Sequence, residues 1–278
     1  FYFGDESDND GSGINRLQIK FFDKYVKGED VDLPRVRYFL MGANEWREES
    51  TWPPPRMKRT KLFLGSAGKA NSADGDGKLA TAPGGSGADH FDYDPQRPVP
   101  TLGGSFNGTM NVPGMLPGPL EQTAIERRDD VLVYTTEPFE VDMEMSGPMT
   151  ARLFVSTSAV DTDFAAKVCQ VLPDGRSYNI GGGIIRLSGR NIGDEREPVT
   201  PGEVYEIVLG LGQTSILLRK GMRLRLQVQS SNFPQFDRNM NTGNPPGTDT
   251  KGVIAHQTVW HGGDRASYLE VPIARAEG

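Results

Sequence analysis

Near the start of the chain, the apolar positions follow the period of an α-helix. Between Ile14 and Val26 they recur every three or four residues, which predicts an amphipathic helix over this range. Ser12 is suited to cap its N-terminus, Lys27 suits the negative end of the helix dipole, and Gly28 can end the helix in a left-handed conformation. The β-rich sequence that follows offers no obvious surface for the apolar stripe. The stripe therefore implies a partner surface that need not lie in this chain.

From Pro34 onward the hydrophobic pattern changes to the alternation of a β-strand. Residues Val36–Leu40 alternate in this way, and Met222–Gln229 alternate strictly, which predicts one buried face and one solvated face. The other strands expected are Thr60–Leu64, Val131–Thr135, Phe139–Met145, Thr150–Ser156, Phe164–Leu172, Ile184–Leu187, Glu203–Leu209, Ser215–Leu218, Val253–His261 and Tyr268–Ile273. Turns rather than helices separate these strands. We therefore predict an all-β fold, an antiparallel β-sandwich of jelly-roll type preceded by one helix.

The glycine and proline content supports this fold class. Of 278 residues, 34 are Gly and 20 are Pro, which is typical of many short strands joined by turns rather than of a helical bundle. Two stretches, Gly65–Gly87 and Pro98–Pro119, are expected to be long loops. Long loops inside a compact domain usually serve function or contacts, so these are candidate contact regions.

Charge and hydropathy exclude two classes of partner. The chain has 30 basic and 37 acidic residues and a net charge of -7, whereas a nucleic-acid surface needs a basic footprint. No apolar run approaches the roughly 18–20 residues that span a bilayer. We therefore expect no nucleic acid and no membrane among the partners of this chain.

The single cysteine, Cys169, excludes an internal disulfide and a multi-cysteine zinc site. It lies in an apolar, strand-like run, so we expect a buried and inert thiol. A lone thiol suits a cytoplasmic protein and an exported one alike, which leaves the compartment open. The chain begins at Phe1 without the features of a signal peptide, so we expect a processed chain or a fragment of a longer protein.

Patterns typical of catalysis are weak in this sequence. The Gly-x-Ser-x-Gly elbow of an α/β-hydrolase is absent, and Gly84–Ala88 and Gly103–Asn107 read as flexible loops. His256 and His261 are five residues apart on one expected strand, so they point to opposite faces and make a poor metal pair. His90 is expected to be an exposed or capping residue.

Three acidic clusters invite a calcium interpretation. Asp5–Gly11 lacks the glutamate that an EF-hand loop needs at its twelfth position. Asp74–Gly77 and Asp161–Asp163 are too short to specify a site, and we expect both to be solvated loops. We therefore expect no metal and no cofactor.

Aromatic side chains on a jelly roll can form a carbohydrate-binding face, because sugar rings stack on flat side chains. The available residues are Trp46, Trp52, Trp260, Tyr93 and Tyr178. Nothing in the sequence shows that they share one exposed face, and half-buried packing is the default for such residues.

A series of segments is more specific than any of these motifs. The segments are Arg35–Arg47, Trp52–Pro53, Tyr93–Pro95, Pro98–Gly104, Arg128–Tyr134, Ala151–Phe164, Leu172–Arg176, Ser230–Asn239 and Asn241–Gly243. In this order they resemble the C-terminal domain of the X-prolyl dipeptidyl-peptidase/cocaine esterase family of serine hydrolases. The resemblance covers nearly all of residues 14 to 274.

The resemblance implies an α/β-hydrolase domain followed by a jelly-roll, galactose-binding-like sandwich. Residues 1–30 would be the C-terminal loop and helix of that catalytic domain, and residues 31–278 would be the sandwich. The family's Ser, Asp and His would all precede Phe1, so no catalytic residue is carried over to this chain. We expect this chain alone to be inactive.

The resemblance also assigns a role to one loop. In family esterases the loop after Leu-Gly-Gly contributes an apolar wall to the substrate pocket, and here that loop is Ser105–Met115. Its candidate pocket residues are Phe106, Asn107 and Met110. The alternative, that these side chains only pack against the catalytic domain, stays open.

The hypothesis that follows is a non-catalytic sandwich domain of a hydrolase that cleaves esters or X-Pro dipeptidyl amides. Its partners would be the upstream α/β-hydrolase domain and, in the intact enzyme, a small ester or peptide substrate, with homo-oligomer contacts left open. The alternative is an independent jelly-roll module that binds carbohydrate. A third hypothesis is a calcium-dependent structural domain.

Overall fold

The computed structural model describes residues 3–7, 11–106, 115–191 and 196–276. Its helices are η1 (Asp5–Ser7), α1 (Ile14–Tyr25), α2 (Thr123–Glu126), η2 (Leu187–Gly189) and η3 (Gly263–Arg265). Its strands are β1 (Val36–Leu40), β2 (Glu45–Glu49), β3 (Lys58–Gly65), β4 (Lys78–Ala80), β5 (Gly87–Tyr93), β6 (Leu132–Thr135), β7 (Met143–Thr157), β8 (Asp163–Val171), β9 (Ser177–Arg186), β10 (Tyr205–Leu218), β11 (Arg223–Gln229), β12 (Ala255–His261) and β13 (Tyr268–Arg275).

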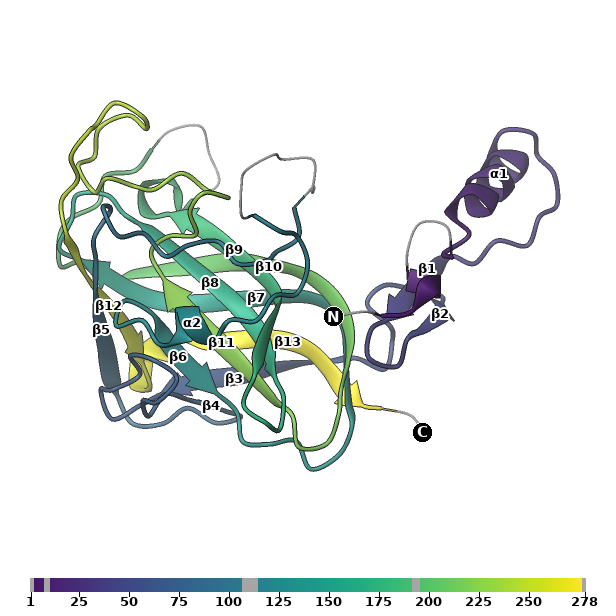
Figure 1. Cartoon of the computed structure of the whole chain (residues 1–278), viewed down its shortest axis with the longest axis horizontal. Coiled ribbons are helices and arrows are strands. Elements are labelled where there is room, and N and C mark those ends of the chain that lie inside the picture. Colours follow the sequence, from purple (N-terminus) through teal and green to yellow (C-terminus); the bar gives the residue numbers. More distant parts are fainter. Residues whose placement is uncertain (1–2, 8–10, 107–114, 192–195, 277–278) are drawn as a thin grey trace.

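The strands from β3 onward form one large sheet that folds into a sandwich (Figure 1). Their order is β5-β12-β7-β13-β3-β4-β6-β11-β8-β9, with β10 paired to β7, and nearly all pairings are antiparallel. β1 and β2 form a separate two-stranded sheet. The predicted all-β sandwich with one preceding helix is therefore confirmed.

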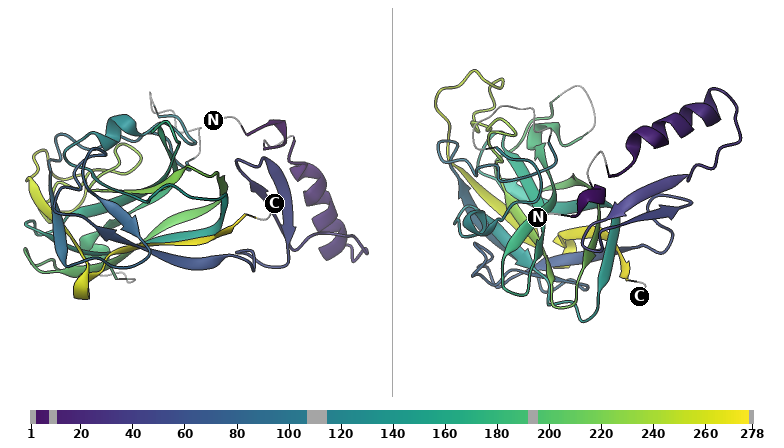
Figure 2. Two further views of the ribbon diagram at one scale, coloured as in Figure 1. Left: turned by 90° about the horizontal axis from the view of Figure 1, so that it is seen from below. Right: turned by 45° about the vertical axis from the view of Figure 1, so that its right-hand side comes forward.

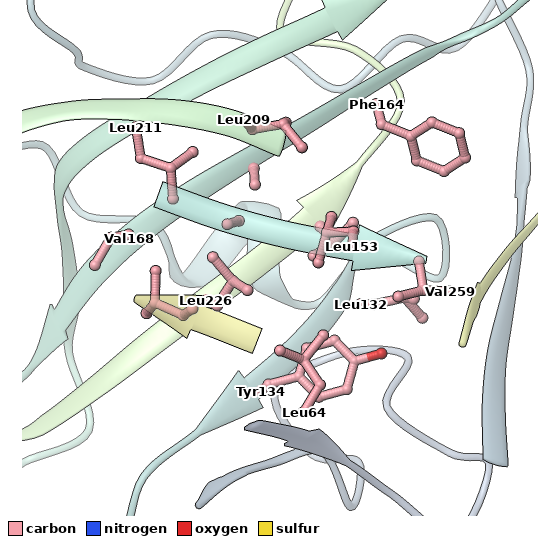
Figure 3. Packing of buried hydrophobic residues seen from close by; sticks show 14 of the residues in the cluster. Leu64, Leu132, Tyr134, Leu153, Phe164, Val168, Leu209, Leu211, Leu226 and Val259 are labelled. Atoms are coloured by element: carbon pink, nitrogen blue, oxygen red, sulfur yellow. The ribbon is translucent and has the colours of Figure 1, made fainter. Parts of the chain in front are cut away.

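The core lies between the two layers of the sandwich. Alternate side chains of β7, among them Leu153 and Val155, point into it because successive residues of a strand face opposite sides. Figure 3 shows Leu153 between residues of several other strands, with Leu209 and Leu211 of β10 on one side and Tyr134 on the other.

The part of the chain from α1 to β2 projects away from this sandwich. In Figures 1 and 2, α1 and the β1–β2 hairpin lie beyond one end of the large sheet. The hairpin packs on the sandwich through a small cluster that includes Tyr38, Leu40 and Leu217. None of the residues of α1 is buried within the described part of the chain.

The predicted start of α1 is wrong at its cap. The N-cap residue is Gly13, at a φ of 66°, and glycine has no side chain that could cap this end. Glycine adopts this left-handed conformation without the steric cost of a Cβ atom. The helix therefore begins one residue later than a cap at Ser12 would imply. The predicted stop is confirmed, because Gly28 has a φ of 74°.

The prediction of a solvated face on β11 is also wrong. Leu224, Leu226 and Val228 enter the core as expected, but the polar residues between them are buried as well. The segment that carries α2 covers this face, and Glu126 of α2 forms an ion pair with Arg225 and accepts a hydrogen bond from Gln227. We call this covered polar face the outer layer of β11, β8 and β9.

Two predicted boundaries change because strands run through turn-forming residues. β7 joins two expected strands across Gly147 and Pro148, and β10 joins two others across Gly210 and Gly212, where the pairing contains a bulge. β4 lies entirely inside the stretch expected to be a loop, Gly65–Gly87, and β5 begins at its last residue.

Candidate functional site

A cavity of about 400 Å³ follows the glycine-rich strand β9. Its lining combines residues far apart in sequence, including Phe3, Trp52, Gly104, Lys167, Gly182 and Phe236. This volume lies within the range of small-molecule sites, and most of the lining is apolar. The cavity is therefore the leading candidate site in the described part of the chain.

The glycines of β9 are required by the close approach of β10. A Cβ atom on Gly183 would lie 2.1 Å from the carbonyl oxygen of Gly210, and one on Gly181 would lie 2.5 Å from that of Leu211. Only glycine permits these backbone distances. The same lack of side chains leaves room for the cavity beside the strand. The run was expected to begin as a strand only at Ile184, because glycine is a weak strand signal.

The loop assigned to the substrate pocket begins at the rim of this cavity. Gly103, Gly104 and Ser105 line the cavity, and the ring of Phe106 packs against Gly104. Asn107 and Met110 lie outside the described residues. The expectation that Phe106, Asn107 and Met110 face a substrate therefore remains a prediction.

A buried lysine is the main polar feature of the cavity that the sequence pattern did not indicate. Lys167 of β8 is only 6% exposed, and its Nζ has no hydrogen-bond partner among the described residues. Burial lowers the pKa of Lys167 to about 8, since a low-dielectric environment disfavours the charged form. The available signal was a lysine inside the otherwise apolar run Phe164–Leu172.

A serine, a histidine and an aspartate meet elsewhere, but not as a catalytic triad. Ser66 Oγ lies 2.7 Å from both carboxylate oxygens of Asp89, and His261 Nε2 lies 3.1 Å from Ser66 and 3.3 Å from Asp89. In a triad the imidazole lies between the serine and the aspartate, with one ring nitrogen toward each. Here one nitrogen faces both groups, and Nδ1 has no partner among the described residues.

The Asp89 cluster instead joins four parts of the fold. Asp89 also accepts hydrogen bonds from Tyr134 Oη, at 2.9 Å, and from the backbone N–H of Ala70, at 3.0 Å. Burial alone would raise the pKa of Asp89, but the hydrogen bonds from His261, Ser66, Ala70 and Tyr134 outweigh it and lower this pKa. We interpret the cluster as structural.

The acidic segment Asp161–Asp163 is not the solvated loop that was expected. Asp163 pairs with Arg186 at 2.8 Å, and Asp161 accepts a hydrogen bond from the backbone N–H of Ser188 at 3.1 Å. Both aspartates are buried and also contact Asn239. Within the described ranges, no three His, Cys, Asp or Glu side chains are grouped so that they could hold a metal ion.

Cys169 and the two histidines of β12 lie as the sequence predicted. Cys169 is fully buried as predicted, and burial raises the pKa of its thiol. His261 is buried while His256 is exposed, in agreement with their predicted opposite orientation. Among the described residues, no helix is long and apolar enough to cross a membrane.

The aromatic residues considered for carbohydrate are spread over both sheets, with Trp46 on β2 and Trp260 on β12. Arg37 lies over the ring of Trp46, with its guanidinium carbon 4.2 Å from the centroid, and Arg265 lies over Trp260 at 4.6 Å. Tyr93 is buried. Each arginine covers one face of the ring that it contacts, and the spread of these residues over two sheets does not favour a carbohydrate-binding module.

The described residues thus form a β-sandwich with a cavity beside β9, preceded by an amphipathic helix that has no buried residue. Residues 29–270 match the family described as the X-Pro dipeptidyl-peptidase C-terminal non-catalytic domain. The chain belongs to this family.

Curated relatives are esterases. The chain is 40% identical to the cocaine esterase of Rhodococcus sp. over 271 residues, which cover 92% of this chain and 45% of that enzyme. It is 27% identical to a putative serine esterase of Mycobacterium tuberculosis, over 78% of this chain and 36% of the relative. The chain therefore spans less than half the length of these relatives.

Solved structures agree with this assignment. An aminopeptidase from a marine-sediment Thaumarchaeota archaeon has a TM-score of 0.78 at 29% identity, covering 95% of this chain and 44% of that one. An α-amino acid ester hydrolase also has a TM-score of 0.78, at 25% identity, covering 96% of this chain and 46% of that one.

Proposed function

We propose that this chain is the non-catalytic sandwich of a serine hydrolase that cleaves esters or X-Pro dipeptidyl amides. In this proposal residues 1–30 are the end of the α/β-hydrolase domain, and residues 31–278 are the sandwich that packs on it and walls part of the substrate cleft. The reaction would be acyl transfer by a serine, a histidine and an oxyanion hole supplied from upstream.

The observation that carries the proposal is the apolar face of α1. Phe22 is 57% exposed and Tyr25 is 65% exposed, and the exposed rings of Phe21 and Tyr25 contact each other at a tilt of 46°. Leu33 and Pro34 extend this face into an apolar groove. An exposed apolar surface of this kind marks an interface, and the family membership supports a catalytic domain as its occupant.

The cavity beside β9 supports the second part of the proposal. Phe3, from the segment that precedes α1, lines the cavity together with Ser105, the first residue of the Ser105–Met115 loop. The same cavity therefore contacts both the segment before α1 and the start of the loop that we propose to wall the substrate cleft.

Two measurements test the proposal. The purified chain should show neither a burst nor turnover with a nitrophenyl ester or an X-Pro anilide. Turnover that a serine-directed inhibitor abolishes would contradict it. The reading frame upstream of the Phe1 codon should encode a Gly-x-Ser-x-Gly elbow and, shortly before Phe1, a histidine.

A binding experiment tests the role of α1. The chain should associate with a separately produced catalytic half of the Rhodococcus cocaine esterase in sedimentation velocity, and the double variant F21S/F22S should lose this association. The matched control is V253S/I254S, because Val253 and Ile254 are also exposed apolar neighbours but lie far from α1 in the sequence. Equal association of both double variants would contradict the assignment of the α1 face.

A further inference from the structure

Lys167 lies on the outer layer of the sheet rather than in the hydrophobic core. Its neighbours in sequence, Ala166 and Val168, both belong to the core, so Lys167 points to the opposite side of β8. It pairs directly with Gln227 of β11 on one side and with Gly182 of β9 on the other.

The ionisable groups near Lys167 leave its charge unbalanced. On the outer layer, Glu126 already forms an ion pair with Arg225 and accepts hydrogen bonds from Ser177 and Gln227. Cys169 is the other titratable group close to Lys167, and burial holds its thiol neutral by raising its pKa. One positive charge therefore remains without a counter-ion among the described residues of this layer.

A buried ammonium group requires an acceptor. Lys167 has three N–H donors and no acceptor capacity, and an unpaired buried charge is costly unless a partner neutralises it. The fold offers neutral amide oxygens in the same region, such as Gln227 Oε1 and Asn232 Oδ1, but within the described residues neither has a hydrogen-bond partner. No carboxylate of the described residues pairs with Lys167 Nζ.

The cavity gives an outside group access to this side chain. Lys167 and Gly182 both line it, and a Cβ atom on Gly182 would lie 3.2 Å from Lys167 Cγ. Glycine at position 182 thus leaves space beside the lysine stem. Phe236 and Ile180 supply apolar wall to the same cavity.

We propose that Lys167 anchors a carboxylate in this cavity, with the apolar part of the same ligand against the cavity wall. A carboxylate supplies the charge-assisted acceptor that the ammonium lacks. The proposal deepens the proposed function, since the loop after Gly104 is the one assigned to the cleft. Only the biological role of the site rests on the proposed function, because the cavity and Lys167 both belong to this chain.

The carboxylate can belong to a free organic acid or to an acidic side chain of a protein segment. Sodium benzoate represents the first source, and N-acetylglutamate N-methylamide represents the second. Benzamide is the neutral counterpart of benzoate, with the same ring and no charge. Binding to the 278-residue chain at pH 7 is measured by the ¹³Cε resonance of Lys167 and by calorimetry.

The expected result is that benzoate or the glutamate model binds and shifts the Lys167 resonance. Affinity should fall at least tenfold in K167M and stay unchanged in K251M, which removes an exposed lysine. Benzamide should bind at least tenfold more weakly than benzoate. Binding of benzoate identifies a free acid as the source, and binding of the glutamate model alone identifies a protein side chain.

Two results would overturn the proposal. One is equal binding of benzoate and benzamide, which would make the cavity a purely apolar site. The other is that neither carboxylate shifts the Lys167 resonance even at about 50 mM, which is roughly 50 times the dissociation constant of 1 mM of an ordinary weak site. Circular dichroism of K167M separates loss of binding from loss of fold. Neither result depends on whether an upstream catalytic domain exists.

Discussion

Arg56 Nη2 lies 2.8 Å from Glu144 Oε1, so an ion pair joins the segment between β2 and β3 to a buried carboxylate of β7. Glu144 is only 1% exposed and also pairs with Arg47 of β2 at 2.6 Å. Ser146 donates a further hydrogen bond to it at 2.8 Å. This one carboxylate therefore attaches the β1–β2 hairpin, and with it α1, to the sandwich.

We predict that E144Q destabilises the chain. The substitution keeps the size of the side chain but removes the buried carboxylate that two guanidinium groups share, which leaves them only the more exposed Glu45 and Glu49. Breaking a buried pair costs about 3 kcal/mol. Equilibrium unfolding in guanidinium chloride measures the loss. The control is E270Q, because Glu270 pairs with Arg59, whose side chain is 73% exposed, and an exposed pair contributes below about 1 kcal/mol. Equal losses in both variants would contradict the assignment.

We predict that D89N destabilises the chain in a pH-dependent way. Asparagine cannot accept all the donors that converge on Asp89, and a buried donor left without a partner costs about 1–3 kcal/mol. The pKa of Asp89 is lower in the folded chain than its ordinary value of 3.8, so the unfolded chain takes up the proton first as pH falls. The carboxylate therefore stabilises the fold above pH 4, and this contribution is lost as pH falls through the folded pKa.

Urea unfolding of the wild type and D89N between pH 3 and pH 7 checks this sign. The difference in unfolding free energy should be constant from pH 7 to about pH 5 and should shrink at lower pH. A difference that grows on acidification would show that the cluster holds a proton rather than a charge. S66A should lower stability as well, since it removes the hydroxyl that donates to Asp89.

We predict that G183A destabilises the sandwich by about 1–3 kcal/mol, the usual cost of overpacking. Its Cβ atom would lie 2.1 Å from the carbonyl oxygen of Gly210, and the backbone of Gly210 has little room to move because β10 is paired with β7. Thermal unfolding of G183A and of the control G84A measures this effect. A Cβ atom on Gly84 meets nothing within 4 Å among the described residues, so G84A should not lower stability. Similar melting temperatures would contradict the close approach of β9 and β10.

The hydrophobic pattern predicted the local elements better than the layers that cover them. The alternation in β11 correctly placed Leu224 and Leu226 in the core, because a buried face needs a strict period of two. It could not show that Arg225 and Gln227 are buried too, since this depends on α2, about 100 residues earlier in the chain. A pattern along one strand contains no information on which distant segment covers its other face.

The same limit applies to the candidate site. The family resemblance singled out Phe106, and the structure places the residues just before it on the cavity rim. The cluster of Ser66, Asp89 and His261 joins positions up to 195 residues apart, and no spacing rule could predict it. The sequence did contain a signal for Lys167, because a lysine in a strand that is buried on both faces either has a partner or destabilises the fold.

We predict that the buried charge of Lys167 destabilises the fold in the absence of a ligand. Lys167 has a pKa of about 8 in the folded chain against 10.5 ordinarily, so the folded state disfavours its charge. Below pH 8 both folded and unfolded chains are protonated, and the wild type carries the full penalty, roughly 3 kcal/mol. K167M keeps the apolar stem and removes the charge, so in the absence of ligand it should be more stable than the wild type at pH 7.

Between about pH 8 and 10.5 only the unfolded chain remains protonated, so the wild type should gain stability with pH and approach K167M. Guanidinium chloride unfolding at pH 7 and pH 10 measures both differences, with K251M as the control for the loss of an exposed lysine. A wild type that is more stable than K167M at pH 7 would show that the ammonium already has a partner within the chain, and the cavity would then need no carboxylate.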